Sequence, residues 1–244
     1  MTRWYKDRRT GTDAVFLEPE EIEATMEAEL EKGGFLPLAA SPVVKIDLFI
    51  ESHLKAPLDQ YADLPADVLG MTEFDRNGKP RIRINRDLSD ALDGEYEIPG
   101  MAGRQRATLA HEAAHVILHR FLFAFDPRQF ELSLSSEKNS TASEPQRCLK
   151  RDAVFRAGGS DWKEVQANMG MAALLMPRRI FRAVSAEEIG RAGIGEAELE
   201  AGTAPVVALA RALSKRFDVS REAARIRLET LKIVRPRGAG ALSF

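Results

Sequence analysis

The chain has 244 residues, of which 44% are hydrophobic and 30% charged, and its formal net charge is −2. This balance is ordinary for a globular protein and argues against nucleic acid or an anionic membrane as the main partner. The single cysteine, Cys148, excludes an intrachain disulfide and fits a reducing cytosol. Because we find neither a signal peptide nor a run of about 20 apolar residues, we expect a cytoplasmic protein with no membrane partner.

The first 54 residues predict a flexible arm followed by two helices. Residues 1–17 are expected to form the arm. A helix is predicted over 18–34, because Pro19 lies near its start, acids fill its first turn and two glycines end it. A second helix is predicted over 41–54, with Ser41 as a candidate cap and apolar residues at helical spacing.

The next segment predicts a β-hairpin. The stretches "VLGMTEFDR" and "KPRIRINRD" are separated by Asn77-Gly78, a dipeptide typical of tight hairpin turns. Arg81 and Arg83 alternate with Ile82 and Ile84, as expected of a strand with one face in water.

The second half of the chain is predicted to be helical, with one long polar interruption. We expect a helix over 102–123, a polar loop over 126–161 and another helix over 161–176. The stretch "APVVALARALSKRFDVSREAARIRLETLKIV" predicts two further helices joined at Asp218-Val219-Ser220.

Residues 111–115 read His-Glu-Ala-Ala-His, the H-E-x-x-H pattern, inside the helix predicted at 102–123. Positions i and i+4 of a helix point to the same side, so His111 and His115 can face one metal ion. Neutral imidazole is a good zinc ligand. The alternative is a helix that carries two incidental histidines.

Glu112 follows the first histidine and would lie beside the open position of such a metal. A carboxylate placed there can take a proton from the attacking water and later pass it to a leaving amine. The sequence therefore predicts Glu112 as the catalytic residue.

A catalytic zinc site also needs a third protein ligand. His119 lies one helical turn beyond His115, about 6 Å away, which suits a supporting contact better than a bond to the same ion. We favour Glu164, from the helix predicted at 161–176; the alternative is that Glu164 is a solvated acid of the first turn. Asn168 shares its helix face and could hold the free N–H of a ligand histidine. Three weaker rivals for the third ligand are Glu144, Asp152 and Asp161.

These residues together resemble the ImmA/IrrE family of metallo-endopeptidases, which are gluzincin-like HExxH zincins. The family's first hallmark is close to "RFTLAHELGHLLLH", matched here by "RATLAHEAAHVILH". The second is close to "E-x-x-A-N-x-F-A-A-x-L-L-M-P", matched by "EVQANMGMAALLMP". The resemblance covers about residues 40 to 235 and implies that His111, His115 and Glu164 bind zinc while Glu112 is the general base.

The sequence departs from the family pattern at several positions. Ala107 stands where Phe is usual, and Ala114 stands where Gly is usual. Gly170 or Met171 occupies a position where an aromatic residue is common. The separation between His115 and the matched glutamate is also long for the family.

The resemblance implies an α+β fold with a minimal zincin-like core, in which a small twisted sheet packs against the active-site helices, and a helical, helix-turn-helix-like C-terminal part. The expected division is an arm at 1–17, a metallopeptidase domain at 18–185 and a helical subdomain at 186–244. Family members cleave helix-turn-helix repressors and so relieve repression in stress responses or mobile elements. The expected cofactor is one Zn²⁺, and Mn²⁺ or another divalent metal is also compatible with these ligands.

Other roles were assigned from residues alone. An extended substrate is expected beside residues 80–85, and Tyr96 is a weak candidate for stabilising the oxyanion. Cys148 is expected to be a passive thiol, the alternative being a redox-sensitive zinc ligand.

The C-terminal stretch supports an alternative class of function. Arg221, Arg225 and Arg227 on a helix-turn-helix could reach DNA. In that case the chain is a DNA-binding or partner-binding regulator, of toxin–antitoxin or mobile-element type, in which the protease-like part is a sensor. DNA binding is not favoured, because the net charge is negative and the basic cluster is short.

Overall fold

Helices dominate the described chain, and its strands form two small sheets, so the coarse α+β class is confirmed. The computed structural model describes residues 3–6, 13–75, 77–93, 100–123, 146–149 and 162–237. Four residues considered above lie outside these ranges: Tyr96, Glu144, Asp152 and Asp161. Most of the predicted loop at 126–161 also lies outside them. No helix within the described ranges combines the length and apolar character needed to cross a membrane.

The chain divides into two compact units, each built from two separate segments. Unit 1 comprises 1–22 and 46–171, and unit 2 comprises 23–45 and 172–244. Two of the three dividing points fall within helices, α1 (Pro19–Lys32) and α6 (Trp162–Leu175), and the third directly precedes Ile46. These units are groupings by spatial contact, and the predicted domain boundaries at 17 and 185 stay predictions.

The main sheet of unit 1 has the strand order β3-β5-β4-β6. Its strands are β3 (Leu58–Ala62), β4 (Val68–Phe74), β5 (Pro80–Asn85) and β6 (Gln146–Leu149). Strand β3 is parallel to β5, whereas β4 is antiparallel to both β5 and β6. The β4–β5 hairpin confirms the prediction from Asn77-Gly78: Gly78 has a φ of 69°, and the Asp75 N–H donates to the Lys79 carbonyl at 3.0 Å.

Strand β5 is a central strand, which corrects the expected position of the substrate. Both of its edges are already hydrogen-bonded, one to β3 and one to β4. Because an added strand needs an unpaired edge, a peptide cannot lie beside residues 80–85 in the way we expected. The alternating pattern identified a strand correctly, but it carries no information on the order of strands in the sheet.

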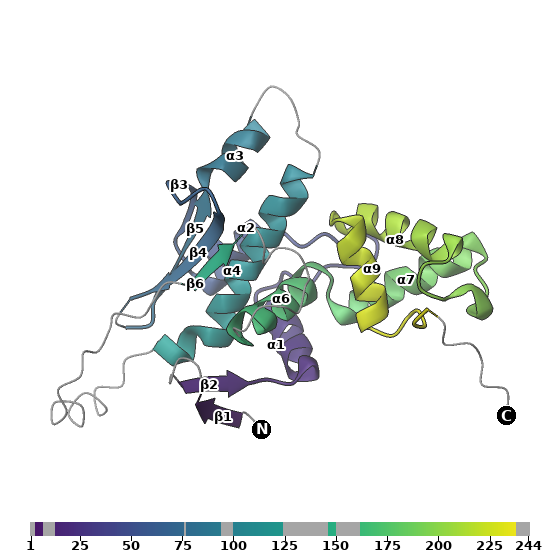
Figure 1. Cartoon of the computed structure of the whole chain (residues 1–244), viewed down its shortest axis with the longest axis horizontal. Helices are drawn as coiled ribbons and strands as arrows, with labels where there is room; N and C mark the ends of the chain where they lie inside the picture. Colours follow the sequence, from purple (N-terminus) through teal and green to yellow (C-terminus); the bar gives the residue numbers. More distant parts are fainter. Residues whose placement is uncertain are drawn as a thin grey trace. The chain divides into compact units, whose positions relative to one another are not determined.

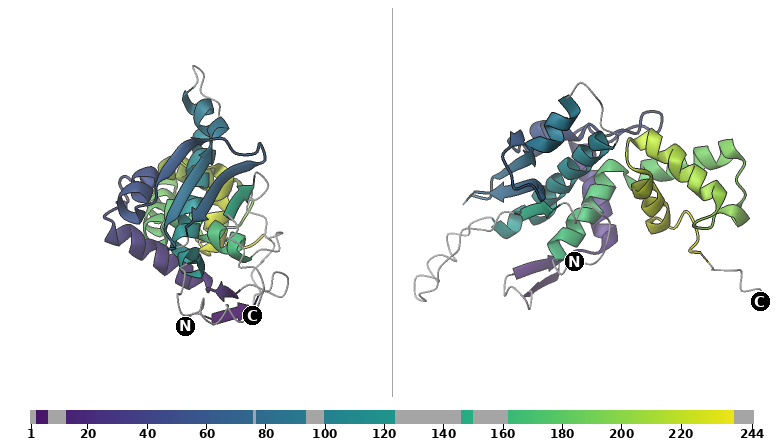
Figure 2. Two further views of the ribbon diagram at one scale, coloured as in Figure 1. Left: turned by 90° about the vertical axis from the view of Figure 1, so that its left-hand side faces the viewer. Right: turned by 45° about the horizontal axis from the view of Figure 1, so that its top comes forward.

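Helix α4 (Met101–Phe123) lies along one face of this sheet, as Figures 1 and 2 show. Its buried residues include three alanines, Ala110, Ala113 and Ala114, each with 0% exposure. Small side chains at these positions let neighbouring backbone approach the helix closely. The shorter helix α3 (Arg86–Asp93) packs against α4 and β3.

Two predictions for the N-terminal part differ from the structure. Residues 41–54 are helical only from Ile46, as α2 (Ile46–Leu48) and a π-helix, η1 (Phe49–Leu54). Residues 42–45, which we expected to form the first turn of this helix, have no regular secondary structure. Two short antiparallel strands, β1 (Arg3–Lys6) and β2 (Asp13–Phe16), occur within the predicted arm.

Unit 2 contains three further helices: α7 (Arg178–Ala192), α8 (Ala204–Phe217) and α9 (Arg221–Thr230). A short 3₁₀ turn, η2 (Glu196–Glu198), precedes α8. The rings of Phe181 and Phe217 lie 5.1 Å apart in its core. The predicted two-helix arrangement is confirmed, since Ser220 caps α9 by accepting a 3.0 Å hydrogen bond from the Ala223 N–H.

Two of the three α9 arginines considered for DNA binding, Arg225 and Arg227, are engaged within unit 2, whereas Arg221 is exposed. Arg227 is only 2% exposed; its guanidinium forms a two-pronged ion pair with Glu23 and donates to the Met176 carbonyl at 2.7 Å. Arg225 is more exposed and pairs with Glu222 at 2.6 Å and Glu229 at 2.5 Å. The contacts of Arg225 and Arg227 occupy guanidinium N–H groups that would otherwise be available to a DNA phosphate.

Replacing Arg227 with Ala should destabilise unit 2 strongly. The substitution leaves the nearly buried Glu23 carboxylate without its cation, which typically costs about 3–5 kcal/mol. The free energy of unfolding, measured by urea denaturation, should fall by about that amount. Arg225→Ala is the matched control and should cost less than about 1 kcal/mol, because its pairs are solvent-screened. Equal losses for the two variants would contradict the assigned role of Arg227.

Candidate metal centre

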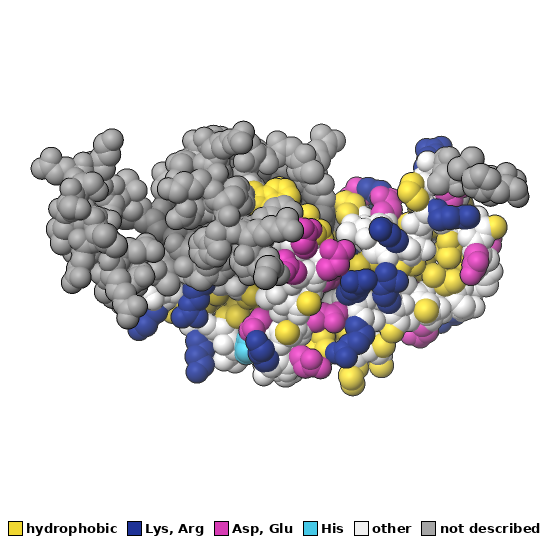
Figure 3. Space-filling model, turned by 90° about the horizontal axis from the view of Figure 1, so that it is seen from below, with side chains coloured by type: hydrophobic (Ala, Val, Ile, Leu, Met, Phe, Trp, Pro, Cys, Tyr) yellow, Lys and Arg dark blue, Asp and Glu magenta, His cyan; other side chains and the backbone are white. Residues whose placement is uncertain are grey.

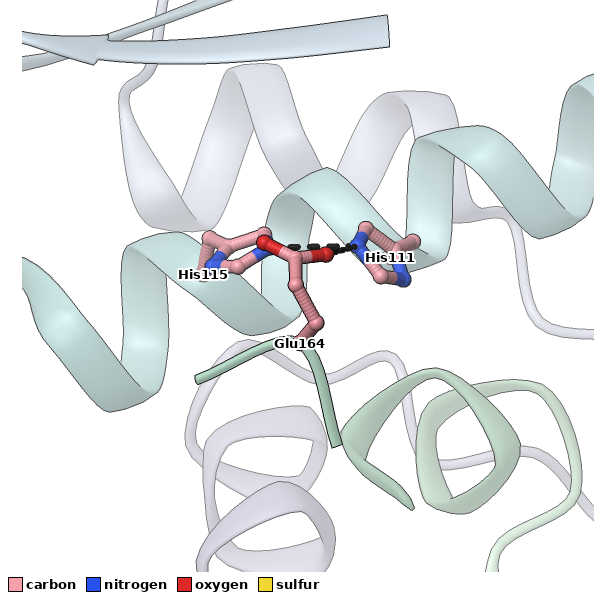
Figure 4. A group of neighbouring side chains, drawn as sticks. All are labelled: His111, His115 and Glu164. Atoms are coloured by element: carbon pink, nitrogen blue, oxygen red, sulfur yellow. Dashed lines mark hydrogen bonds and ion pairs between the residues drawn. The ribbon is translucent and has the colours of Figure 1, made fainter. Parts of the chain in front are cut away.

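Helix α4 directs two buried imidazoles to one point. His111 and His115 are 1% and 0% exposed, and their Nε2 atoms lie 3.1 Å apart. Their separation by four residues places both on the same side of the helix. Figure 4 shows the two rings side by side on one stretch of the α4 ribbon.

Glu164, from the first turn of α6, completes the cluster. One carboxylate oxygen lies 3.1 Å from His111 Nε2 and the other lies 3.3 Å from His115 Nε2. The Glu164 side chain is 18% exposed, whereas both imidazoles are almost completely buried. The structure thus brings together the three residues that the sequence assigned as ligands, although they are up to 53 positions apart.

This donor set fits a zinc ion. Zinc bonds of about 2.0–2.1 Å at tetrahedral angles place neighbouring ligand atoms about 3.3 Å apart. The two Nε2 atoms lie 3.1 Å apart, close to that value, and each lies 3.1 or 3.3 Å from one of the two Glu164 carboxylate oxygens. One ligand atom from each of the three side chains lies within 4.8 Å of the others. His111, His115 and Glu164 could therefore hold a metal ion. No other group of three such side chains was found among the described residues.

Glu112 lies at the back of the cluster, between α4 and strand β4. It is 0% exposed, and its Oε2 accepts a 2.6 Å hydrogen bond from the Thr72 hydroxyl. Its Oε1 is buried and has no hydrogen-bond partner within the part of the chain that the structure describes. A buried carboxylate oxygen without a partner is costly and indicates that another group completes it.

The absence of a side chain at Gly70 leaves room for the Glu112 carboxylate between α4 and β4. A Cβ atom at residue 70 would lie 2.7 Å from Thr108 Cγ2 and 2.8 Å from Glu112 Oε1. Any larger residue would therefore force β4 and α4 apart or displace the carboxylate. The sequence alone gave no signal for Gly70 or Thr72, because their importance depends on how the strand packs against the helix.

Both histidines are held through their second ring nitrogen. His111 Nδ1 lies 3.2 Å from Asn168 Oδ1, the contact expected from the helical spacing of Asn168 and Glu164. His115 Nδ1 lies 3.0 Å from His119 Nδ1, and His119 Nε2 lies 3.0 Å from Gln166 Oε1. His119 thus contacts a ligand histidine from outside the cluster. Sequence reasoning missed Gln166, which lies about 200° around α6 from Glu164.

The charges of the cluster stabilise one another. Burial alone lowers the pKa of His111, but its hydrogen bond to Glu164 and the charge of Glu112 outweigh burial and raise that pKa above its ordinary value. Burial alone raises the pKa of Glu164, yet the charge of His115 and hydrogen bonds to both histidines bring it well below the usual range. A proton held by this pair would compete with a metal ion for the same ligand atoms, because metal ligands bind in their deprotonated form.

Two neighbours of the cluster are shifted mainly by burial. Burial raises the pKa of Glu112, and the opposing effects of His111, His115 and Thr72 do not cancel it. Burial and the charge of His115 lower the pKa of His119 to about 3. Near neutral pH, His119 is therefore an uncharged imidazole with one donor nitrogen and one acceptor nitrogen.

No protein-family model matches the chain, and no curated protein matches it either. The assignment of a function therefore depends on the residues of this site and on the motif resemblance described above.

Replacing Gly70 with Ala should disturb the site through Glu112. The new methyl group would collide with Thr108 and Glu112, and such overpacking typically costs about 1–3 kcal/mol in the free energy of unfolding. Gly103→Ala in α4 is the matched control, since a Cβ there meets nothing within 4 Å. It should leave stability unchanged or raise it by up to about 1 kcal/mol. Thermal unfolding of both variants checks this, and an unaffected Gly70→Ala protein would disprove the close approach.

Proposed function

We propose that the chain is a zinc-dependent endopeptidase of the ImmA/IrrE type. The observation that carries the proposal is the convergence of His111, His115 and Glu164 next to a buried carboxylate oxygen of Glu112 that has no partner in the described chain. The two sequence phrases that resemble the family contain these same four residues. An H-E-x-x-H helix that only stabilised the fold would have no need for the buried, half-satisfied Glu112.

In this proposal His111 and His115 bind zinc through Nε2 and Glu164 binds it through its carboxylate. The bound ion supplies a Lewis acid that polarises the scissile carbonyl and makes a water more acidic. The same ligand types accept manganese, iron or cobalt, so the identity of the metal is part of the proposal.

Glu112 is proposed as the general base and then the general acid. The Thr72 hydroxyl fixes one of its oxygens, which leaves Oε1 to accept a proton from the attacking water. The same proton then passes to the nitrogen of the leaving amine as the peptide bond breaks, so the carboxylate returns to its initial state. The raised pKa of Glu112 supports this role, because a base with a pKa nearer to neutrality both accepts and releases a proton readily.

The proposed fold is a minimal zincin-like core. What supports it is the arrangement of unit 1, where helix α4 lies along a small sheet and the first turn of α6 supplies Glu164. An extended peptide would then add to an open edge of the sheet and not to the central strand β5.

The proposed substrate is a helix-turn-helix repressor, whose cleavage would relieve repression. This part of the proposal comes from the family resemblance. The alternative, a DNA-binding regulator, is weakened by the contacts of Arg225 and Arg227 inside unit 2. Basic and acidic side chains are also interspersed over the described part of the face drawn in Figure 3. Such a mixed surface does not favour binding of a polyanion.

Replacing Glu112 with Gln should reduce cleavage by about 10²–10⁴-fold while zinc stays bound. The amide keeps the shape of the side chain but cannot accept the proton. Cleavage would be followed by mass spectrometry on two substrates: whichever helix-turn-helix protein is encoded by a neighbouring gene, and a peptide library prepared from a whole proteome. Zinc content of each protein would be measured in parallel.

Glu51→Gln is the matched control, because Glu51 is an exposed acid of the same unit that lies in the π-helix η1. It should cleave at the wild-type rate. Wild-type activity in Glu112→Gln would remove Glu112 from the mechanism. Absence of cleavage of both substrates by zinc-loaded wild-type protein would count against the endopeptidase as a whole.

A further inference from the structure

We infer that His119 and Gln166 are positioning residues that fix the tautomer of His115 and so direct its Nε2 lone pair into the metal centre. This inference rests on the proposed metal site, but it does not depend on which reaction that site performs. It extends the centre to a row of three side chains from two helices, α4 and α6.

The row is continuous and buried. His115 Nδ1 and His119 Nδ1 lie 3.0 Å apart, and His119 Nε2 lies 3.0 Å from Gln166 Oε1. His115 is 0% exposed, and His119 and Gln166 are each 1% exposed. Water therefore has little access to these nitrogens, and each contact must be a hydrogen bond between the side chains themselves.

The amide oxygen of Gln166 determines which nitrogen donates and which accepts in each hydrogen bond of the row. An oxygen only accepts, so the ring proton of a neutral His119 must be on Nε2, where it donates to Gln166. His119 Nδ1 then has a lone pair and accepts from the Nδ1–H of His115. With its proton on Nδ1, His115 presents a bare Nε2, which is the atom that lies 3.1 Å from His111 Nε2 and 3.3 Å from Glu164.

The other ligand histidine, His111, contacts an amide oxygen directly and not through a second imidazole. His111 Nδ1 faces the Asn168 amide oxygen directly, at 3.2 Å. At His115 the amide acts through an intervening imidazole, so the identity of residue 119 matters as much as that of residue 166. The phenyl ring of Phe resembles imidazole in shape but accepts no hydrogen bond, whereas the Oδ1 of Asn occupies about the place of His Nδ1 and does accept one.

The test compares zinc affinity of His119→Phe and His119→Asn. Removing the partner of a ligand histidine typically weakens metal binding 10- to 100-fold. We expect a loss of that size for His119→Phe and a change below about threefold for His119→Asn. Affinity for Zn²⁺ would be measured with the full chain by competition against a chromophoric chelator, with circular dichroism to confirm folding. If residue 119 only fills space, Phe should be the milder change, and that order of affinities would overturn the inference.

A second measurement needs no variant. In the zinc-loaded wild-type chain, ¹⁵N chemical shifts and couplings to ring protons should show a proton on Nδ1 of His115 and on Nε2 of His119. The chain has only four histidines, so the signals can be assigned one by one. A proton on Nδ1 of His119 would overturn the inference even if both variants failed to fold.

Gln166 provides a graded check. Gln166→Glu retains an acceptor oxygen and should keep zinc affinity, whereas Gln166→Leu removes the acceptor and should weaken it by about tenfold. Equal affinities for these two variants would remove Gln166 from the row. None of these readouts involves proteolysis. The endopeptidase proposal could therefore fail while the row is upheld, and the row could fail while cleavage is observed.

Discussion

The structure of unit 1 depends on the meeting of three polar side chains that would be unfavourable to bury separately. His111, His115 and Glu164 lie in an environment where an isolated charge would be strongly destabilising. Their mutual contacts reverse that effect for Glu164, whose pKa falls although burial opposes the change. The first turn of α6 is therefore tied to the middle of α4 by electrostatic attraction as well as by packing. Because a divalent cation carries more charge than a shared proton, it would strengthen the same arrangement.

Residues of strand β4 and helix α6 position Glu112 and the two ligand histidines. Strand β4 contributes Gly70, which lets the sheet approach α4, and Thr72, which holds one oxygen of Glu112. Beyond the ligands, Asn168 and Gln166 from α6 direct the two histidines from outside. A site built from regular helices and a strand keeps its geometry better than one built on loops. In the proposed endopeptidase, that rigidity would keep Glu112 close to the attacking water.

Local patterns in the sequence were sufficient for α1, α4, α6, α8 and α9 and for the β4–β5 hairpin, whereas α3 and α7 were not predicted and the helix expected over 41–54 begins only at Ile46. The spacing of His111 and His115 follows from the helix alone, and Asn77-Gly78 identified the hairpin because few residues fit that turn. Strand order could not be predicted, because β3 and β6 join the sheet through contacts distant in sequence. For the same reason Gly70, Thr72 and Gln166 were missed: each acquires its role from a neighbour on another element. Glu164 was found because it lies on a helix with a recognisable phrase.

In the proposed centre, one divalent cation is bound by two imidazole nitrogens and one carboxylate. Zinc K-edge X-ray absorption of the loaded full-length chain, with the Glu164→Ala variant beside it, tests this most directly. We expect one zinc per chain, two histidine nitrogens at about 2.0–2.1 Å and an oxygen shell at about 2.0–2.2 Å that loses one scatterer in the variant, together with a large fall in affinity. A sulfur ligand, or a spectrum and affinity unchanged by Glu164→Ala, would contradict it.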